Sequence, residues 1–299
     1  MGIRGVWSTL RRSFKTTDPL ESTTRYNVGI DMFSLVYTHR AHLDELLTLL
    51  KSWSDHGNTL TCIWDGVAPK EKQEIIGQRR SARDSAIEKK TDLETYLAEY
   101  GSQLSDTDIK HLKTAITSLS WQGWHLTGTL RRKICETLGP SVKHVYAEEE
   151  ADDLLIEMST TNTSNGEKKI DIIMTLDSDL LAMGAEHIWR LLRIRGAWLT
   201  EDISVEAVCN EWGISLGQLQ DACFLAGWDR CHLVTKGTYM SFETALNRIK
   251  YYQSLATVLE KFPNQSTTDA MDRLCILKKE SRSRWQEILK NRSKDTYTN

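Results

Sequence analysis

Two acidic stretches organise the chain: YAEEEADDLL at residues 146–155 and TLDSDLL at residues 175–181. In the first, Leu154, Leu155 and Met158 follow the acids at helical spacing, which predicts a helix that begins with carboxylates. The helix dipole favours acidic side chains at an N-terminus, so this stretch alone is also typical of an ordinary surface helix.

The acids of the second stretch follow the apolar run at residues 172–176, which predicts a buried strand over 171–176. On an extended strand, Asp177 and Asp179 would point to the same side, where two carboxylates repel unless a positive group lies between them. A divalent cation is the simplest such group, and carboxylate oxygens suit Mg²⁺ or Mn²⁺. This stretch therefore predicts a metal site.

Further strands are predicted at residues 28–30 and 59–64, which acids follow directly, Asp31 and Asp65. Residues 143–146 predict another short strand, before the first acidic stretch. Helical patterns alternate with these strands, which predicts an α/β fold with a mostly parallel central sheet and helices on both faces. In such sheets the reactive groups gather beyond the carboxyl ends of the strands. Although one strand that ends in Asp would be unremarkable, several predict a shared acidic site.

Residues 70–90 are rich in charge, and Lys72, Arg79 and Arg83 are spaced so that they share one face of a helix. Pairs of opposite charge four residues apart make a solvated surface helix an equally good explanation of this segment alone. If this helix lies beside a metal-binding acid, its basic face could bind a phosphate. Two further helical stretches, 93–100 and 106–119, predict an insertion over the sheet edge.

Periodicity also predicts helices and strands elsewhere in the chain: helices at 32–53, 205–212, 216–226 and 241–262, and strands at 187–193 and 197–200. Basic residues mark both ends. Residues 1–24 predict a basic N-terminal arm, and residues 278–294 a basic helix or tail that is better explained by solubility than by binding.

Composition narrows the classes of protein to which the chain can belong. With 299 residues, 40% of them hydrophobic, the chain can form one large α/β domain, with or without an appendage. Its six cysteines lack C-x-x-C spacing, which predicts reduced thiols in an intracellular protein and argues against zinc. No apolar run approaches a membrane span. The net charge of -3 includes the acidic clusters, so it does not exclude a nucleic-acid partner.

Taken in order, the motifs resemble the flap endonuclease superfamily, structure-specific 5′ nucleases that include the xeroderma pigmentosum group G type enzymes. The resembling segments are MGIRGVW at 1–7, GIDMFSLVY at 29–37, IWDGVAPKEKQEIIGQRR at 63–80, EEEADDLL at 148–155, TLDSDLLAMG at 175–184 and FLAGWD at 224–229. Each match is weak alone, but together and in this order they make the resemblance specific. The compact size is similar to that of large-DNA-virus members.

The resemblance implies a PIN-like nuclease core over residues 1–200 with a helical arch inserted at about 88–125, then a helical nucleic-acid-binding region and basic tail over 201–299. It implies a phosphodiesterase with two Mg²⁺ ions, for which Mn²⁺ can substitute. The implied metal ligands are Asp31, Asp65, Glu150, Asp152, Asp153, Asp177, Asp179 and Asp229. Glu148 competes with Glu150 for this role, and the Ala-Asp that follows Glu150 favours the later register.

By the same resemblance, Lys72 and Arg79 would contact the scissile phosphate, while Gly2, Arg83 and Lys236 would contact the nucleic acid. The implied substrate is branched or nicked DNA during replication, repair or recombination, in the nucleus or a viral replication compartment. The protein is expected to be a monomer without membrane contact, and it lacks a recognisable sliding-clamp motif near its C-terminus.

The sequence departs from these relatives after Asp229. They carry a Gly-x-Gly hairpin that clamps duplex DNA, whereas this chain has Gly237 alone, so Lys236, Arg248 and Lys250 are the nearest bases that could replace the hairpin. This loss keeps open an RNA endonuclease similar to the herpesvirus host-shutoff proteins. A non-catalytic nucleic-acid-binding module is a third alternative, but it predicts missing carboxylates, and all of them are present.

Overall fold

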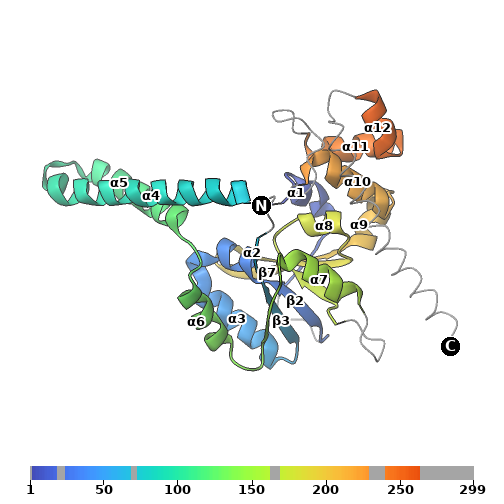
Figure 1. Ribbon diagram of the computed structural model, residues 1–299, viewed down its shortest axis with the longest axis horizontal. Coiled ribbons are helices and arrows are strands. Elements are labelled where there is room, and N and C mark those ends of the chain that lie inside the picture. The colour runs from blue at the N-terminus through green and yellow to red at the C-terminus, as the bar shows by residue number, and fades with distance from the viewer. Residues whose placement is uncertain (1, 19–23, 69–72, 162–168, 229–239, 263–299) are drawn as a thin grey trace. The chain divides into compact units, whose positions relative to one another are not determined.

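The computed structural model describes residues 2–18, 24–68, 73–161, 169–228 and 240–262. Its centre is a seven-stranded sheet with the strand order β1-β7-β6-β5-β2-β3-β4 (Figure 1). The strands are β1 (Lys15–Thr17), β2 (Asn27–Asp31), β3 (Thr59–Trp64), β4 (Lys143–Tyr146), β5 (Ile172–Met174), β6 (His187–Ile194) and β7 (Ala197–Ser204). From β6 to β4 neighbouring strands run parallel, while β7 and β1 extend the sheet antiparallel. The predicted α/β fold with a mostly parallel sheet is confirmed.

The chain divides into two compact units. Unit 1 comprises Met1–Trp64, Leu138–Ala147 and Ala151–Asn299, and unit 2 comprises Asp65–Thr137 and Glu148–Glu150. The helices of unit 1 are α1 (Val6–Leu10), α2 (Met32–Thr38), α3 (Leu43–Asp55), α7 (Ala151–Thr160), α8 (Asp179–Met183), α9 (Val205–Trp212), α10 (Leu216–Gly227), α11 (Phe242–Tyr252) and α12 (Leu255–Lys261). Unit 2 contains α4 (Gln73–Tyr100), α5 (Asp106–Gly123) and most of α6 (Gly128–Leu138), a helix that the sequence patterns did not reveal.

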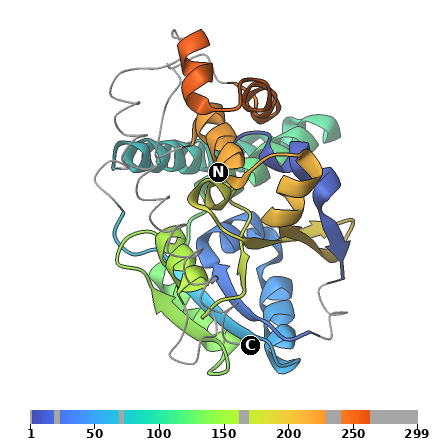
Figure 2. The same cartoon turned by 90° about the vertical axis from the view of Figure 1, so that its right-hand side faces the viewer.

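Strand β2 lies inside the sheet, between β3 and β5. Val28 to Asp31 are all buried, because helices cover both faces of the sheet (Figure 2). A Cβ atom at Gly29 would lie 2.4 Å from Cδ1 of Ile170 and 2.8 Å from Cδ2 of Leu155, which belongs to α7. Glycine at this position therefore allows α7 to pack closely on the strand.

The order of the strands reverses at β2. Strands β3 and β4 follow on one side of it, and β5 and β6 lie on the other. In an open parallel sheet, such a reversal leaves a crevice beyond the carboxyl ends of the two central strands, where ligands bind. Asp31 is the last residue of β2, and Thr175 follows the end of β5. The sheet topology therefore places these two residues at the point of reversal.

Two of the predicted helical segments are interrupted. The helix predicted over 32–53 is interrupted by a 3-10 turn, Arg40–His42, because the buried His39 ring turns inward to a hydrogen bond with the Leu191 carbonyl, at 3.0 Å. The helices predicted over 241–262 are α11 and α12, which separate at Gln253, a residue with a left-handed φ of 65°. Ser254 then caps α12 by accepting a hydrogen bond from the N–H of Thr257 at 3.2 Å.

The basic arm predicted over residues 1–24 is folded in its described part. It forms α1, a 3-10 turn at Arg11–Ser13 and the edge strand β1. Ile3, Val6 and Leu10 are buried in the core, while the basic side chains of this segment stay exposed: Arg4, Arg11, Arg12 and Lys15. Because the prediction of a basic arm rested on the charged residues of this segment, composition alone did not predict that its apolar residues are buried.

The helices after residue 200 share one hydrophobic core with α1 and the sheet. This core includes Val6, Ile173, Leu180, Phe224 and Leu246. The boundary predicted near residue 200 falls inside β7, an integral strand of the sheet. In the part of the chain that the structure describes, no helix is long and apolar enough to cross a membrane.

Unit 2 consists mainly of a helical hairpin, α4 and α5, joined by a short turn at Gly101–Gln103. Helix α4 is continuous over 28 residues, so the separate helix predicted over 93–100 is its last two turns, and the insertion predicted from about residue 88 begins earlier. Leucine and isoleucine side chains three and four residues apart form the seam, and they remain half-buried: Leu93, Leu97, Ile109, Leu112, Ile116 and Leu119.

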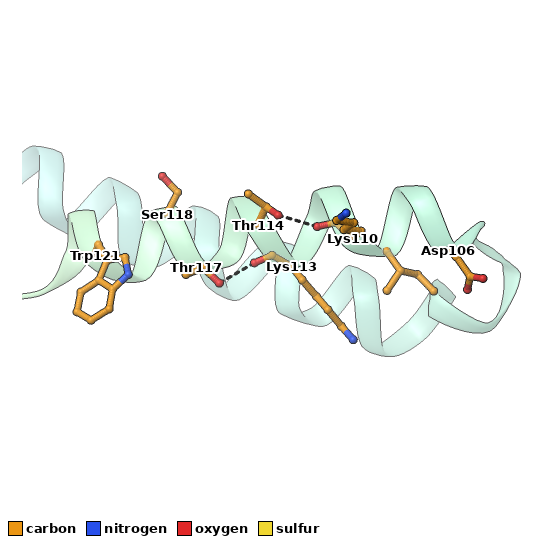
Figure 3. A pocket seen from close by; sticks show the side chains of 8 residues that line it. Asp106, Lys110, Lys113, Thr114, Thr117, Ser118 and Trp121 are labelled. Carbon is orange, nitrogen blue, oxygen red and sulfur yellow. Dashed lines mark hydrogen bonds between the residues drawn. The ribbon is translucent and has the colours of Figure 1, made fainter. Parts of the chain in front are cut away.

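One flank of α5 lines a shallow, open hollow. Figure 3 shows that Lys110, Lys113, Thr114 and Thr117 lie along this flank, with Trp121 at its end. The hydroxyls of Thr114 and Thr117 donate to the carbonyls four residues before them, at 2.9 Å and 2.8 Å. Because all the lining residues belong to one helix, the hollow is a helix surface rather than an enclosed site.

Candidate metal and nucleic-acid site

Asp31 combines the end of a strand with the start of a helix. It is the last residue of β2 and the N-cap of α2, where its Oδ1 accepts a hydrogen bond from the N–H of Ser34 at 3.0 Å. Its Oδ2 accepts a second bond from the hydroxyl of Thr175 at 2.8 Å. The side chain is only 6% exposed, so these bonds offset part of the free-energy cost of removing a carboxylate from water.

Residues 175–179, which we call the acidic loop, comprise the turn between β5 and α8 and the first residue of α8. The Thr175 hydroxyl accepts from the N–H of Asp177 at 3.0 Å, and Oδ1 of Asp177 accepts from the N–H of Asp179 at 3.1 Å. A chain of hydrogen bonds thus connects Asp31, Thr175, Asp177 and Asp179. All four residues belong to unit 1.

The prediction that Asp177 and Asp179 lie on an extended strand was wrong. Strand β5 ends at Met174, and Asp179 is the first residue of α8. The backbone turns because the Asp177 side chain accepts from the N–H two residues later, a local turn that aspartate favours. Hydrogen bonds, rather than strand alternation, set the directions of these two carboxylates.

Gly2 lies directly against the acidic loop. Its N–H donates to Oδ1 of Asp177 at 3.1 Å. A Cβ at this position would lie 2.4 Å from that oxygen and 2.2 Å from Oγ of Ser178, too close for any side chain. The sequence predicted that Gly2 approaches nucleic acid, which stays a prediction. The structure gives an independent reason for glycine here, namely close packing on the loop.

Asp179 is buried, with 6% exposed, and α10 lies behind it. Burial raises the pKa of the Cys223 thiol on α10, and the negative charge of Asp179 raises it further. The buried Gln220 amide, also on α10, donates to the Ala182 carbonyl of α8 at 3.0 Å. These contacts fix α8, and with it the position of Asp179.

The first acidic stretch opens α7, as predicted. Asp152 and Asp153 lie in the first turn of the helix, half-buried, where the helix dipole favours negative charge. The buried Leu155 and Ile156 anchor α7, which packs on β2, β3 and β5. Because Leu155 of α7 packs against Gly29, this close contact also fixes the positions of Asp152 and Asp153.

Asp65 and Glu150 belong to unit 2. The N–H of Gly66 donates to the Glu149 carbonyl at 2.6 Å, and the N–H of Val67 donates to the Glu148 carbonyl at 3.0 Å. These bonds bring the segment that begins with Asp65 next to the acidic stretch. Glu150 is half-buried whereas Glu148 is exposed, and the choice between them as a metal ligand stays a prediction.

The predicted phosphate-binding bases are described only in part. Arg79 is exposed on α4, and Arg83, one turn later, is half-buried. Lys250 donates to the Trp212 carbonyl at the end of α9, at 2.6 Å, and the guanidinium of Arg248 lies 3.9 Å from the centre of the Phe262 ring. Both bases thus have contacts inside the protein. Lys72, Asp229, Lys236 and the basic tail lie outside the described residues.

Among the residues that the structure describes, no three histidine, cysteine or acidic side chains gather closely enough to hold a metal ion. The donors that the acidic loop and Asp31 offer are oxygens, which is the chemistry that Mg²⁺ prefers. Two contributors were missed from the sequence, Ser34 and Thr175. Ser34 follows Asp31 at the spacing of a helix cap, so the local sequence could have predicted their contact. Thr175 contacts Asp31 across 144 positions, and no local pattern predicts such a contact.

Comparisons with known proteins identify the fold. No protein-family model matches the chain, and no curated protein matches its sequence. Among solved structures, the catalytic core of Rad2 in complex with DNA substrate matches 97% of this chain and 81% of its own, with a TM-score of 0.55 and 16% identity. Flap endonuclease-1 from Methanococcus jannaschii matches 92% of this chain and 84% of its own, with a TM-score of 0.54 and 18% identity.

Human GEN1 in complex with Holliday junction DNA matches 94% of this chain with a TM-score of 0.52 and 15% identity. This chain spans 63% of that GEN1 chain. The protein therefore has the fold of the flap endonuclease and xeroderma pigmentosum group G type nucleases. The resemblance predicted from the ordered motifs is confirmed at the level of the fold.

Proposed function

We propose that this protein is a divalent-metal-dependent, structure-specific 5′ nuclease that hydrolyses phosphodiester bonds in DNA during replication, repair or recombination. The observation that carries the proposal is the buried Asp31, bonded through Thr175 to the acidic loop at the point where the strand order reverses. The fold supports it, since solved nucleases of this fold include complexes with DNA substrate and Holliday junction DNA.

The proposed metal ligands are Asp31, Asp65, Glu150, Asp152, Asp153, Asp177, Asp179 and Asp229. Bound Mg²⁺ or Mn²⁺ would supply an activated water and neutralise charge on the leaving oxygen. Thr175 orients the Asp31 carboxylate, and Gly2 orients that of Asp177. Lys72 and Arg79 offset the charge that develops on the phosphoryl oxygens. Gly2, Arg83 and Lys236 hold the nucleic acid.

An RNA endonuclease is the second candidate function. It is favoured by one observation, the single glycine, Gly237, in the stretch after Asp229 where a duplex-clamping hairpin would need two. Glycines allow backbone N–H groups to approach a phosphate closely, so their loss weakens duplex binding in particular. Single-stranded RNA would not need such a clamp.

The test is digestion of matched substrates: 5′-flap DNA, nicked duplex DNA, a four-way DNA junction and single-stranded RNA. We expect cutting near the branch of a DNA substrate with Mg²⁺ or Mn²⁺ and none with EDTA. Preferential cutting of the RNA would establish the second candidate instead. Cleavage that persists in EDTA would overturn metal dependence.

Asp179→Ala is the catalytic control in the same experiment. We expect the cleavage rate to fall about a thousandfold, roughly 4 kcal/mol of transition-state stabilisation, while substrate still binds. The substitution keeps the backbone N–H that donates to Asp177 and removes a buried charge, so the melting temperature should stay or rise. A near wild-type rate in a folded Asp179→Ala protein would contradict the proposed metal site.

A further inference from the structure

We propose that Trp7 is a positioning residue for the acidic loop, an inference that rests on the proposed nuclease function. Its indole N–H donates to the Leu176 carbonyl at 3.0 Å. The N–H of Leu176 donates in turn to Oγ of Ser34, at 3.1 Å. Both polar backbone groups of Leu176 are thus fixed by side chains from distant parts of the sequence.

Leu176 is the residue directly before Asp177. Since β5 ends at Met174 and α8 begins at Asp179, regular secondary structure does not determine the backbone between them. The direction of the Asp177 carboxylate follows from the orientation of the peptide groups on either side of Leu176. Catalytic groups must be held within about 0.5 Å of their working geometry, so these two bonds bear directly on activity.

Trp7 is itself held in place from three sides. Val6 and Leu10 bury α1 in the core on either side of it, and Phe14 packs edge-on at 6.1 Å between ring centres. The guanidinium of Arg190 lies 4.5 Å from the centre of the Trp7 ring, at a distance where cation–π attraction is effective.

Arg190 lies on β6 and is fixed by an ion pair with Glu201 on the neighbouring strand β7. Glu201 is only 4% exposed, and a buried ion pair of this kind is costly to break. Burial lowers the pKa of Arg190, and Glu201 opposes that shift. The sheet thereby holds Trp7, and Trp7 holds the acidic loop.

The chain offers a matched control in Trp212. Its indole N–H donates to Oγ of Ser13 at 3.2 Å, and the guanidinium of Arg12 lies 3.7 Å from its ring centre. Both tryptophans are half-buried in unit 1, and each donates one hydrogen bond beneath an arginine. They differ in the acceptor, because only the bond from Trp7 ends on the acidic loop.

The experiment compares Trp7→Phe with Trp212→Phe, each of which removes one indole donor and keeps an aromatic ring. Binding of Mn²⁺ alone is measured from the electron paramagnetic resonance signal of the free ion, and kcat and KM are measured on the best substrate. We expect Trp7→Phe to weaken Mn²⁺ binding and lower kcat by about 10- to 100-fold, with KM little changed. Trp212→Phe should change neither, while both variants lose similar amounts of thermal stability.

Equal effects of the two substitutions, or a loss of kcat in Trp7→Phe without weaker Mn²⁺ binding, would overturn the role of Trp7 and leave the proposed function standing. A wild-type protein that neither binds Mn²⁺ nor cleaves would overturn both. If Trp7→Phe does not fold, benzothienylalanine at position 7 serves instead. It replaces the indole N–H by sulfur in a ring of the same shape, and the same loss is expected.

Discussion

The acidic loop carries proposed metal ligands and the α4–α5 hairpin carries the proposed phosphate contact Arg79, yet the two regions are built in different ways. The loop is buried at Thr175, Ser178 and Asp179. Hydrogen bonds connect it to residues far away in the sequence, among them Gly2 and Asp31. Its geometry is therefore determined by tertiary structure.

The hairpin depends on local contacts. In its described part only Ala86 and Gly123 are buried, and the leucines and isoleucines of the seam are half-exposed. Hydroxyls such as Thr91 and Thr95 donate to carbonyls one turn earlier in the same helix, at 3.0 Å and 2.9 Å. Regions with few buried apolar contacts open at a lower free-energy cost than the core.

This difference indicates that the two regions would contribute to the proposed activity in different ways. Groups that must hold their directions for chemistry are fixed by long-range hydrogen bonds in unit 1. The proposed phosphate contact Arg79 lies instead on a helical hairpin that can deform at low cost. Substitutions in unit 1 and in the α4–α5 hairpin should therefore have different effects, and three predictions test this difference, from the largest expected effect to the smallest.

Among these three predictions, the largest effect is expected at Arg79 on α4. If its guanidinium contacts the scissile phosphate, its contribution grows only as charge develops in the transition state. We expect Arg79→Ala to lower the single-turnover rate by about tenfold to a hundredfold, with a much smaller loss of affinity. Single-turnover kinetics and substrate titration measure the two effects separately.

Arg80→Ala is the matched control for Arg79. Arg80 is exposed on the same helix, but an adjacent helical residue points in a different direction. The control should leave the chemical step unchanged. If both variants lose affinity at an unchanged single-turnover rate, α4 merely holds the nucleic-acid backbone, and the catalytic role of Arg79 is wrong.

The second effect compares a glycine of β2 in unit 1 with a glycine of the hairpin. Gly29→Ala forces a methyl group against Ile170 and Leu155, at 2.4 Å and 2.8 Å, and should destabilise unit 1 by about 1–3 kcal/mol. At Gly77, in α4, a Cβ would meet nothing within 4 Å, so Gly77→Ala should stabilise the helix by roughly 0.5–1 kcal/mol. Urea unfolding and amide exchange in α4 measure these changes. Equal effects at the two positions would remove the distinction between a tightly packed and an open region.

The sequence predicted the parts of the fold that depend on local pattern. The strands predicted at 59–64 and 143–146 coincide with β3 and β4. For β3 the reason is a run of buried side chains that ends directly before Asp65 and Gly66. The ordered motifs led to the correct nuclease fold. They also placed Asp31 correctly at the end of β2, since the acid directly follows an apolar run.

Features that depend on contacts between distant residues could not be predicted. The turn in the acidic loop needs Thr175 and Gly2, and the bond from Trp7 to Leu176 spans 169 positions. The break after α2 depends on a carbonyl of β6 that His39 reaches. Patterns of hydrophobicity contain no signal for such pairs, so the directions of Asp177 and Asp179 came only from the structure.

The smallest expected effect is an acid sensitivity of unit 1 through His39. Burial lowers the pKa of His39 below its ordinary value of 6.5, against the opposing hydrogen bond with Leu191, and the nearby His42 and Arg193 lower it further. The unfolded chain therefore binds a proton more readily than the folded protein, so stability from this residue is complete above about pH 6.5 and declines as the pH falls below it. Glu45 also faces this cluster, but Arg193 lowers its pKa, so its contribution is lost at a more acidic pH.

His39→Gln keeps a donor for the Leu191 carbonyl and cannot be protonated, so it should flatten the decline in unfolding free energy between about pH 7 and pH 5.5. If wild type and His39→Gln lose stability in parallel, the acid sensitivity comes from elsewhere, with His144 the next residue to test, because burial lowers its pKa and its Nδ1 accepts from the Trp64 indole at 3.2 Å.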